Sequence, residues 1–109
     1  MNRYLFEMQL APQAFAAFVK NPADRYQANA AVAESVGGRL IDYYFAVGSN
    51  TIYTIMEVPD PVKVEALTMA VLAGGVVTNI KTVQVLTASE AVAAMQMAGE
   101  AGYRAPSTQ

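Results

Sequence analysis

The stretch Asp42–Pro61, "DYYFAVGSNTIYTIMEVPDP", contains two apolar segments joined by a short glycine turn. A strand with one face in water alternates apolar and polar residues, because successive side chains point to opposite faces of the sheet. Here three aromatic residues follow one another at positions 43–45, and positions 52–58 contain few polar residues. We therefore expect a hairpin within a sheet that is covered on both faces.

The residues on either side of this hairpin extend the pattern of strands and helices. Residues 3–10 alternate as a strand, and proline at positions 12, 22 and 61 suits the first turn of three helices. Paired glycines at 37–38 and 74–75 end two helices, and a capping box at 87–90 begins the last one. The expected strands are about 3–10, 39–47, 51–58 and 76–86, and the expected helices are about 12–20, 22–36, 61–73 and 88–99.

The order strand–helix–strand occurs twice, and the hairpin joins the two copies. Because such crossovers are right-handed, this order gives the ferredoxin-like split arrangement. We therefore predict an α+β fold, a ferredoxin-like βαββαβ sandwich. Its four-stranded antiparallel sheet carries the helices on one face, and a C-terminal helix follows. Residues 1–101 are predicted to form this domain, and residues 102–109 are predicted to form a flexible C-terminal tail.

This arrangement leaves one face of the sheet bare. If Tyr4 and Phe6 face the helices, the bare face carries Leu5, Glu7, Gln9, Tyr53, Ile55 and Glu57, with either Tyr43 and Phe45 or Tyr44 from the next strand. The chain is 54% hydrophobic and 15% charged, whereas about 45–50% and about 25% are usual. So little charge on a small domain indicates that outer surface is buried. We predict a homodimer, or a higher homo-oligomer, whose sheets pack face to face.

Composition also excludes several classes of function. The net charge is −2, with seven Lys and Arg residues, so no basic face is available for nucleic acid. The absence of cysteine and histidine removes disulfides, thiol nucleophiles and the usual zinc and haem ligands, so we expect no metal and no cofactor. The start of the chain lacks a signal-peptide pattern, and the most apolar run, 67–77, has about half the length of a membrane helix. We expect a cytoplasmic protein without a nucleic-acid or membrane partner.

The candidate pocket residues are polar side chains of the predicted strands, namely Glu7, Tyr43, Tyr44, Tyr53 and Glu57. A buried carboxylate with a raised pKa can act as a general acid or base, and tyrosines can line a pocket for a small apolar ligand. In the structural interpretation, Glu7 pairs with a nearby basic residue, Glu57 is solvated at its strand end, and the tyrosines fill the interface. We prefer the structural interpretation, and we assign no catalytic residue.

The segment Val32–Asp60, "VAESVGGRLIDYYFAVGSNTIYTIMEVPD", resembles the core of the GYD domain, a small bacterial family named after a Gly-Tyr-Asp element. The similar features are a helix ending in Gly-Gly-Arg-Leu, an aromatic strand, a glycine turn, an apolar strand and a Pro-Asp helix start. The resemblance extends over about residues 4–87. It implies the ferredoxin-like fold and membership of the dimeric α/β-barrel group, and it implies no particular reaction.

The chain departs from the name-giving element of that family. Gly48 matches the glycine, whereas Asn50 stands where tyrosine is expected and Thr51 where aspartate is expected. If those two positions serve a site in relatives, that site is altered in this chain. Gly48 itself transfers only as a turn residue.

Three functions fit these observations. The first is a small oligomeric ligand-binding or regulatory module, with a pocket between sheet and helices or between subunits. The second is a cofactor-independent enzyme, monooxygenase- or isomerase-like, acting on a small apolar or aromatic substrate; only analogy with the barrel group supports it. The third is a structural assembly unit. Both ligand-based functions need a pocket, and the enzyme also needs a polar group with a shifted pKa inside it.

Overall fold

The computed structural model describes residues 1–107 of the chain. Eight elements follow one another in the order β1 (Asn2–Leu10), α1 (Pro12–Lys20), α2 (Tyr26–Ser35), β2 (Arg39–Phe45), β3 (Thr51–Val58), α3 (Pro61–Ala73), β4 (Val77–Val85) and α4 (Ala88–Glu100). Residues 102–107 form neither helix nor strand, and the last two positions of the predicted tail lie outside the described residues. No helix within residues 1–107 is both long and apolar enough to cross a bilayer.

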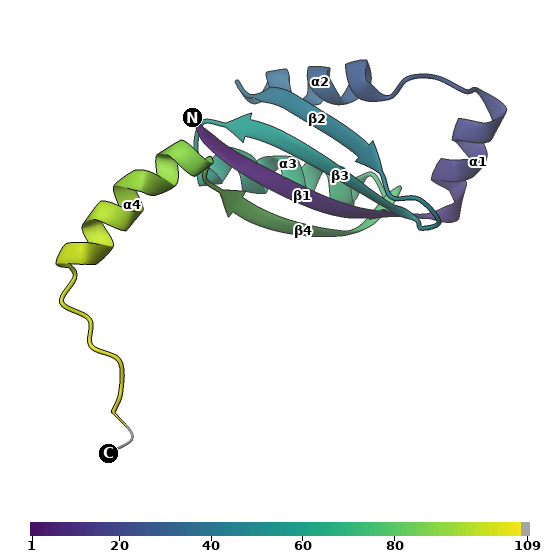
Figure 1. Cartoon of the computed structure of the whole chain (residues 1–109). Helices are drawn as coiled ribbons and strands as arrows, with labels where there is room; N and C mark the ends of the chain where they lie inside the picture. The colour runs from purple at the N-terminus through teal and green to yellow at the C-terminus, as the bar shows by residue number, and fades with distance from the viewer. Residues whose placement is uncertain (108–109) are drawn as a thin grey trace.

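The four strands form one antiparallel sheet in the order β2-β3-β1-β4, so the two strands at its centre are β3 and β1. Helix α2 packs on β2 and α3 packs on β4, and both helices lie on the same side of the sheet (Figure 1). This is the predicted α+β, ferredoxin-like arrangement. The side of the sheet away from the helices is here called the outer face, and no other element of the described chain covers it (Figure 1).

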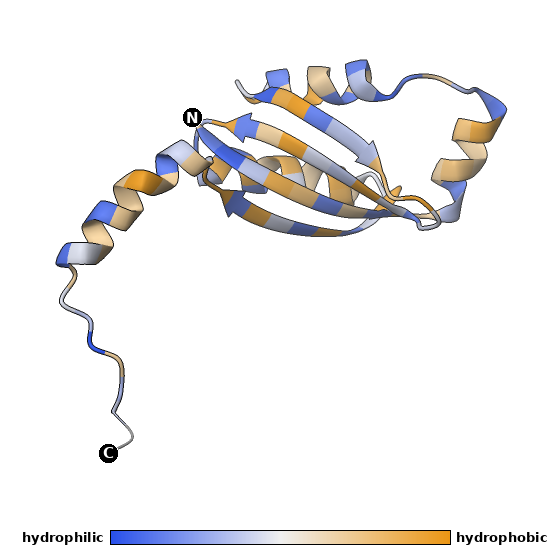
Figure 2. Cartoon of the chain, in the orientation of Figure 1, coloured by the Kyte–Doolittle hydropathy of each residue, from blue (hydrophilic) through white to orange (hydrophobic). Residues whose placement is uncertain are grey.

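Strand register decides which residues share each face. Leu5 lies directly opposite Ile55 on one side and Val83 on the other, so these three side chains form an apolar row on the outer face. Along each strand, residues alternate between hydrophobic and hydrophilic over part of the length only (Figure 2). A register shift between Leu40 and Asp42 then changes the phase of β2. Its consequence is that Tyr44 lies on the outer face, whereas Tyr43 and Phe45 lie on the helix side; the sequence had left both possibilities open.

The core lies between the sheet and its helices. The inward positions of the two central strands are buried, and Ala33 of α2 and Leu67 of α3 close over them. These inward residues are Tyr4, Phe6, Met8, Leu10, Ile52, Thr54, Met56 and Val58. Helix α3 begins as predicted, since the carboxylate of Asp60 accepts a hydrogen bond from the backbone N–H of Lys63 at 3.0 Å.

The predicted start of the second helix is wrong. Helix α2 begins at Tyr26 rather than at Pro22, and Asn21 ends α1 instead of capping α2. The carboxylate of Asp24 accepts a hydrogen bond from the backbone N–H of Tyr26 at 2.8 Å, so Asp24 belongs to the turn that precedes the helix. Residues 21–25 are therefore an extended linker that lets α1 stand at the end of the sheet while α2 runs along it (Figure 1).

Helix α4 projects away from the sheet and has no buried residue (Figure 1). Its capping box is present as predicted, because Thr87 and Glu90 each accept a backbone N–H of the other. Its Met95 and Met97 side chains are 67% and 74% exposed. The cap signals of the sequence thus identify this helix correctly, but they carry no information about what the helix packs against.

Gly38 provides a test of the fold, because its lack of a side chain lets β2 approach β3. A Cβ atom at this position would overlap the backbone oxygen of Glu57 and lie 3.1 Å from that of Ala33. Since backbone cannot move aside easily, we expect Gly38→Ala to lower the free energy of unfolding by more than about 2 kcal/mol, measured by urea denaturation. Gly99→Ala, in α4 with open space around it, is the matched control and should leave stability unchanged or slightly raised. Equal stability of Gly38→Ala and wild type would contradict the β2–β3 packing described here.

Candidate functional site

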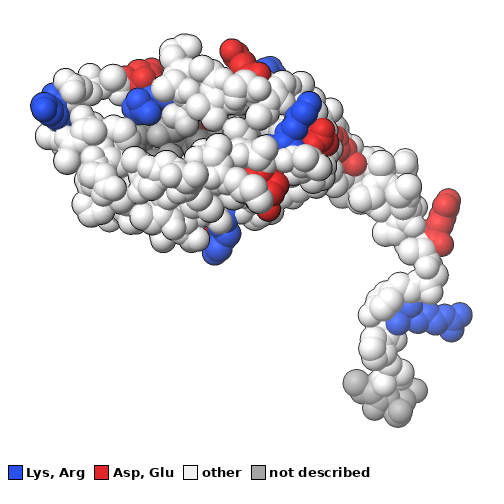
Figure 3. All heavy atoms as spheres, turned by 180° about the vertical axis from the view of Figure 1, so that it is seen from behind, with Lys and Arg blue, Asp and Glu red and all other residues white. Residues whose placement is uncertain are grey.

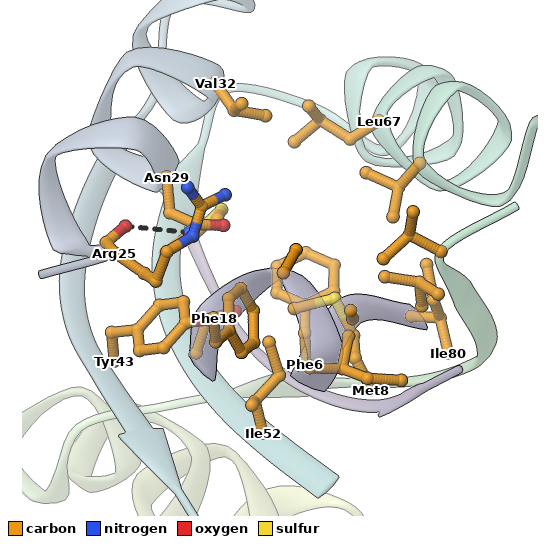
Figure 4. A pocket seen from close by; sticks show the side chains of 18 of the residues that line it. Phe6, Met8, Phe18, Arg25, Asn29, Val32, Tyr43, Ile52, Leu67 and Ile80 are labelled. Carbon is orange, nitrogen blue, oxygen red and sulfur yellow. Dashed lines mark hydrogen bonds between the residues drawn. The ribbon is translucent and has the colours of Figure 1, made fainter. Parts of the chain in front are cut away.

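A cavity of about 560 Å³ lies between the sheet and the helices. It is bounded by inward-facing strand residues below and by α1, α2 and α3 around its sides, as Figure 4 shows. Seen from the helix side, the molecule is hollowed there, and few charged side chains surround the hollow (Figure 3). Small-molecule pockets usually measure about 300–1,000 Å³, so the space is sufficient for a small organic ligand.

The cavity is lined mainly by apolar side chains from elements far apart in the sequence. Phe6, Met8, Ile52 and Ile80 come from three strands, and Val32 and Leu67 face the space from α2 and α3 (Figure 4). The pattern that places them there is the period of two in each strand. The aromatic ring of Phe18, from α1, closes one end by packing edge-on against Phe45 of β2, with the ring centroids 6.0 Å apart.

Thr54 is the polar exception at the floor of this cavity. It occupies an inward position of β3 between Ile52 and Met56, and it is fully buried. Its hydroxyl has no hydrogen-bond partner among the described residues. Because a buried polar group without a partner is costly, an unsatisfied hydroxyl facing a cavity is a feature expected of a binding site.

Tyr43 and Arg25 supply further polar groups at the edge of the cavity. Tyr43 lies directly opposite Thr54 in the β2–β3 register. Burial raises the pKa of the Tyr43 phenol, and the positive charge of Arg25 opposes this rise in part. The phenol is therefore neutral near pH 7 and can donate a hydrogen bond. The Arg25 guanidinium stands 5.6 Å from the centroid of the Phe18 ring, in a cation–π arrangement.

Several other polar groups near the cavity already have partners. The Thr68 hydroxyl donates to the backbone oxygen of Val64 at 3.0 Å. The Asn29 side-chain amide donates to the backbone oxygen of Arg25 at 2.9 Å, drawn as the dashed line in Figure 4. The hydroxyl of Tyr26 donates to the backbone oxygen of Leu40 at 3.1 Å. The Tyr26 bond joins the start of α2 to β2, whereas the other two bonds are local to α3 and to the start of α2.

The structure divides the five candidate residues of the sequence analysis between the two faces of the sheet. Tyr43 alone lines the cavity. Glu7, Tyr44, Tyr53 and Glu57 lie on the outer face, where the register places Tyr44, Tyr53 and Glu7 side by side. That position agrees with the predicted strand phase, and a pocket between two packed sheets stays a prediction.

Ion pairs connect the charged residues of the outer face. Glu57 accepts hydrogen bonds from the guanidinium groups of Arg39, at 2.6 and 3.1 Å, and Arg3, at 3.4 Å. The Arg39 hydrogen bond holds the pKa of Glu57 below its ordinary value of 4.5, against a smaller opposing effect of burial, and Arg3 adds to the lowering. The carboxylate of Glu57 thus lies between two arginines, and its side chain is 22% exposed. Glu7 pairs with Lys81 at 3.8 Å, as the structural interpretation expected.

The side chains that line the cavity can bind a ligand through apolar contacts and hydrogen bonds. No group of three or more carboxylates within residues 1–107 is placed to hold a metal ion. In this part of the chain, Tyr43 is the one titratable group besides Arg25 that lines the cavity, and its pKa moves away from neutrality. General acid–base catalysis favours groups with pKa values near the working pH, so this lining suits binding better than proton transfer.

Sequence reasoning missed Thr54 and Arg25. The signal for Thr54 was present, because it is the one polar residue among the inward positions 52, 54, 56 and 58 of β3. A period-two reading of that strand identifies it as a polar group in the core. Nothing in the sequence signals Arg25, because its position depends on where the linker between α1 and α2 ends.

Comparisons with known proteins agree with this fold. The family model described as the GYD domain matches residues 4–95. A crystal structure of the protein Atu4242 from Agrobacterium tumefaciens is similar, with a TM-score of 0.50 and 16% sequence identity over 81% of this chain and 94% of that chain. At that identity the likeness concerns the fold alone. The comparison with curated proteins gives no match. The family model spans the sheet, the three helices around the cavity and the start of α4, and the chain belongs to the GYD domain family.

Proposed function

We propose that this protein is a small-molecule-binding module that works as a homodimer. The ligand is a small, largely apolar molecule held in the cavity between sheet and helices. The single observation that supports this function most is the cavity itself, about 560 Å³ lined mainly by apolar side chains between the sheet and the helices. A tightly packed assembly unit has no need of such a space, because empty volume in a core costs stability.

The outer face supports the proposed dimer. Its central row, Leu5, Ile55 and Val83, is apolar, and Val83 is 50% exposed in the single chain. Four strands of about eight residues make a face of about 19 by 26 Å, which suits a small specific interface. Each 100 Å² of apolar surface removed from water contributes about 2.5 kcal/mol, so a second copy on this face gains substantial free energy. Glu57 pairs with Arg3 and Arg39, and Glu7 pairs with Lys81, so these groups keep a partner when the face is covered. Asp42, opposite Ile55 on the same face, makes no ion pair among the described residues.

Filling the cavity tests the proposed ligand site. N-phenyl-1-naphthylamine, a neutral apolar dye that fluoresces in apolar surroundings, is the probe. We expect wild type to bind it with a saturable rise in fluorescence. Val32→Trp should weaken binding by about tenfold or more, because Val32 faces the cavity from α2 and is only partly covered (Figure 4).

Val19→Trp is the matched control for this experiment. Val19 lies on α1, is 80% exposed and does not line the cavity, so the same change there should leave dye binding unaltered. No saturable binding to wild type, or equal binding by both tryptophan variants, would argue against a ligand site in the cavity.

The dimer is tested by placing a charge in the apolar row. We expect wild type at micromolar concentration to have the molar mass of two chains in light scattering. Ile55→Lys should have the mass of one, because burying an unpaired ammonium group against a second sheet is costly. Val62→Lys, on the outside of α3 at 78% exposure, should remain dimeric. Circular dichroism confirms that each variant is folded; a monomeric wild type, or a folded Ile55→Lys dimer, would refute the sheet-to-sheet arrangement.

A further inference from the structure

One positive charge at the cavity has no negative partner. Arg25 lies at the end of the α1–α2 linker and lines the cavity (Figure 4). The arginines and lysine of the outer face, Arg3, Arg39 and Lys81, are each paired with a glutamate. Within residues 1–107, by contrast, the Arg25 guanidinium makes no ion pair. Its charge is therefore available to a ligand.

Arg25, Tyr43 and Thr54 are three polar residues of the cavity lining. Arg25 is close enough to Tyr43 for its charge to act on the phenol. Tyr43 in turn is the cross-strand neighbour of Thr54, and side chains in such pairs are about 5 Å apart at their Cβ atoms. A guanidinium and a neutral phenol thus stand near each other at the edge, and a buried hydroxyl without a partner faces the interior.

The charge of the lining limits the charge of the ligand. Among the residues that the structure describes, Arg25 is the one charged residue that lines the cavity, and all other lining residues are neutral. A single negative charge balances it, whereas a phosphate dianion would leave excess negative charge in apolar surroundings. The planar guanidinium also matches the two oxygens of a carboxylate, to which it can donate two parallel hydrogen bonds.

We propose that the ligand is a small apolar or aromatic monocarboxylate. Its carboxylate accepts hydrogen bonds from Arg25 and Tyr43 at the edge, and its apolar body lies against residues such as Phe6, Met8 and Ile80. A hydroxyl or similar polar atom on the body meets the hydroxyl of Thr54. This inference rests on the proposed function, because it assigns a ligand class to the same cavity.

Two probes of equal shape test whether the site prefers a negatively charged ligand. We expect wild type to bind 2-naphthoate about tenfold tighter than the neutral 2-naphthamide, the usual effect of a charge-assisted hydrogen bond, as measured by titration calorimetry at pH 7. Arg25→Gln should remove this preference by weakening 2-naphthoate alone. Lys20→Gln removes a positive charge from α1 outside the cavity lining, and it should leave both affinities unchanged.

The Arg25→Lys variant separates the effect of the positive charge from the effect of the planar guanidinium group. It keeps the positive charge but loses the planar fork, so it should retain part of the preference for 2-naphthoate. Equal affinities of the two probes for wild type, a preference that survives Arg25→Gln, or no measurable binding of 2-naphthoate would each overturn the proposal. If the neutral naphthylamine dye still binds, such a result refutes the ligand class and leaves the cavity's binding function intact; if the dye fails as well, the function itself is refuted.

A second pair of probes tests the buried hydroxyl. We expect 6-hydroxy-2-naphthoate to bind wild type at least as tightly as 2-naphthoate, because Thr54 replaces the water that the added hydroxyl loses. Thr54→Val has the same shape without the hydroxyl, so it should weaken 6-hydroxy-2-naphthoate selectively and leave 2-naphthoate unchanged. Thermal unfolding without ligand should show this variant to be no less stable than wild type, because the hydroxyl removed has no partner. A parallel loss for both probes, or lower stability of the variant, would contradict the role given to Thr54.

Discussion

The alternation of side chains along β1 and β3 is the constraint on which the rest of the structure depends. These two strands form the centre of the sheet, so each of their residues must face either the helices or the opposite side. Both sets contain apolar residues, but the helices of one chain cover a single face (Figure 1). The second copy that we propose on the outer face would resolve this imbalance and leave the helix side of each chain available for the cavity.

The two faces also differ in how they satisfy charge and polarity. On the outer face, Glu57 pairs with Arg3 and Arg39 and Glu7 pairs with Lys81, so these groups keep a partner when the face loses water. On the helix side, Arg25 and Thr54 remain without such partners at the edge and floor of an apolar space. Charged groups that pair within their own chain can be buried at an interface between identical copies. Polar groups that lack a partner in the chain can instead bind a ligand.

Much of the fold could be predicted from sequence, because its signals are local. Asp60 with Pro61, the capping box at Thr87 and the glycines after two helices each act within a few residues, and the structure contains the corresponding helix ends. The late start of α2 was missed, because Pro22 suits a first helical turn and Asp24 acts equally well in the turn before a helix.

The site was less predictable, because it depends on relations between distant residues. The register shift after Leu40 decides that Tyr43 rather than Tyr44 faces the helices, and no local pattern in β2 reveals it. The position of Arg25 depends likewise on how the linker spans from α1 to α2. Thr54 could have been identified from sequence, since the alternation of β3 alone shows that it is a polar residue in an apolar row.

Intermolecular nuclear Overhauser effects test most directly whether a second copy covers the outer face. The sample is a mixture of ¹³C-labelled and unlabelled chains, observed with isotope filtering so that contacts between different chains alone give signals. The predicted result is a set of such contacts from the methyl groups of Leu5, Ile55 and Val83, which form the apolar row. Contacts confined to other surfaces, or methyl groups of this row that contact only water, would contradict the sheet-to-sheet dimer.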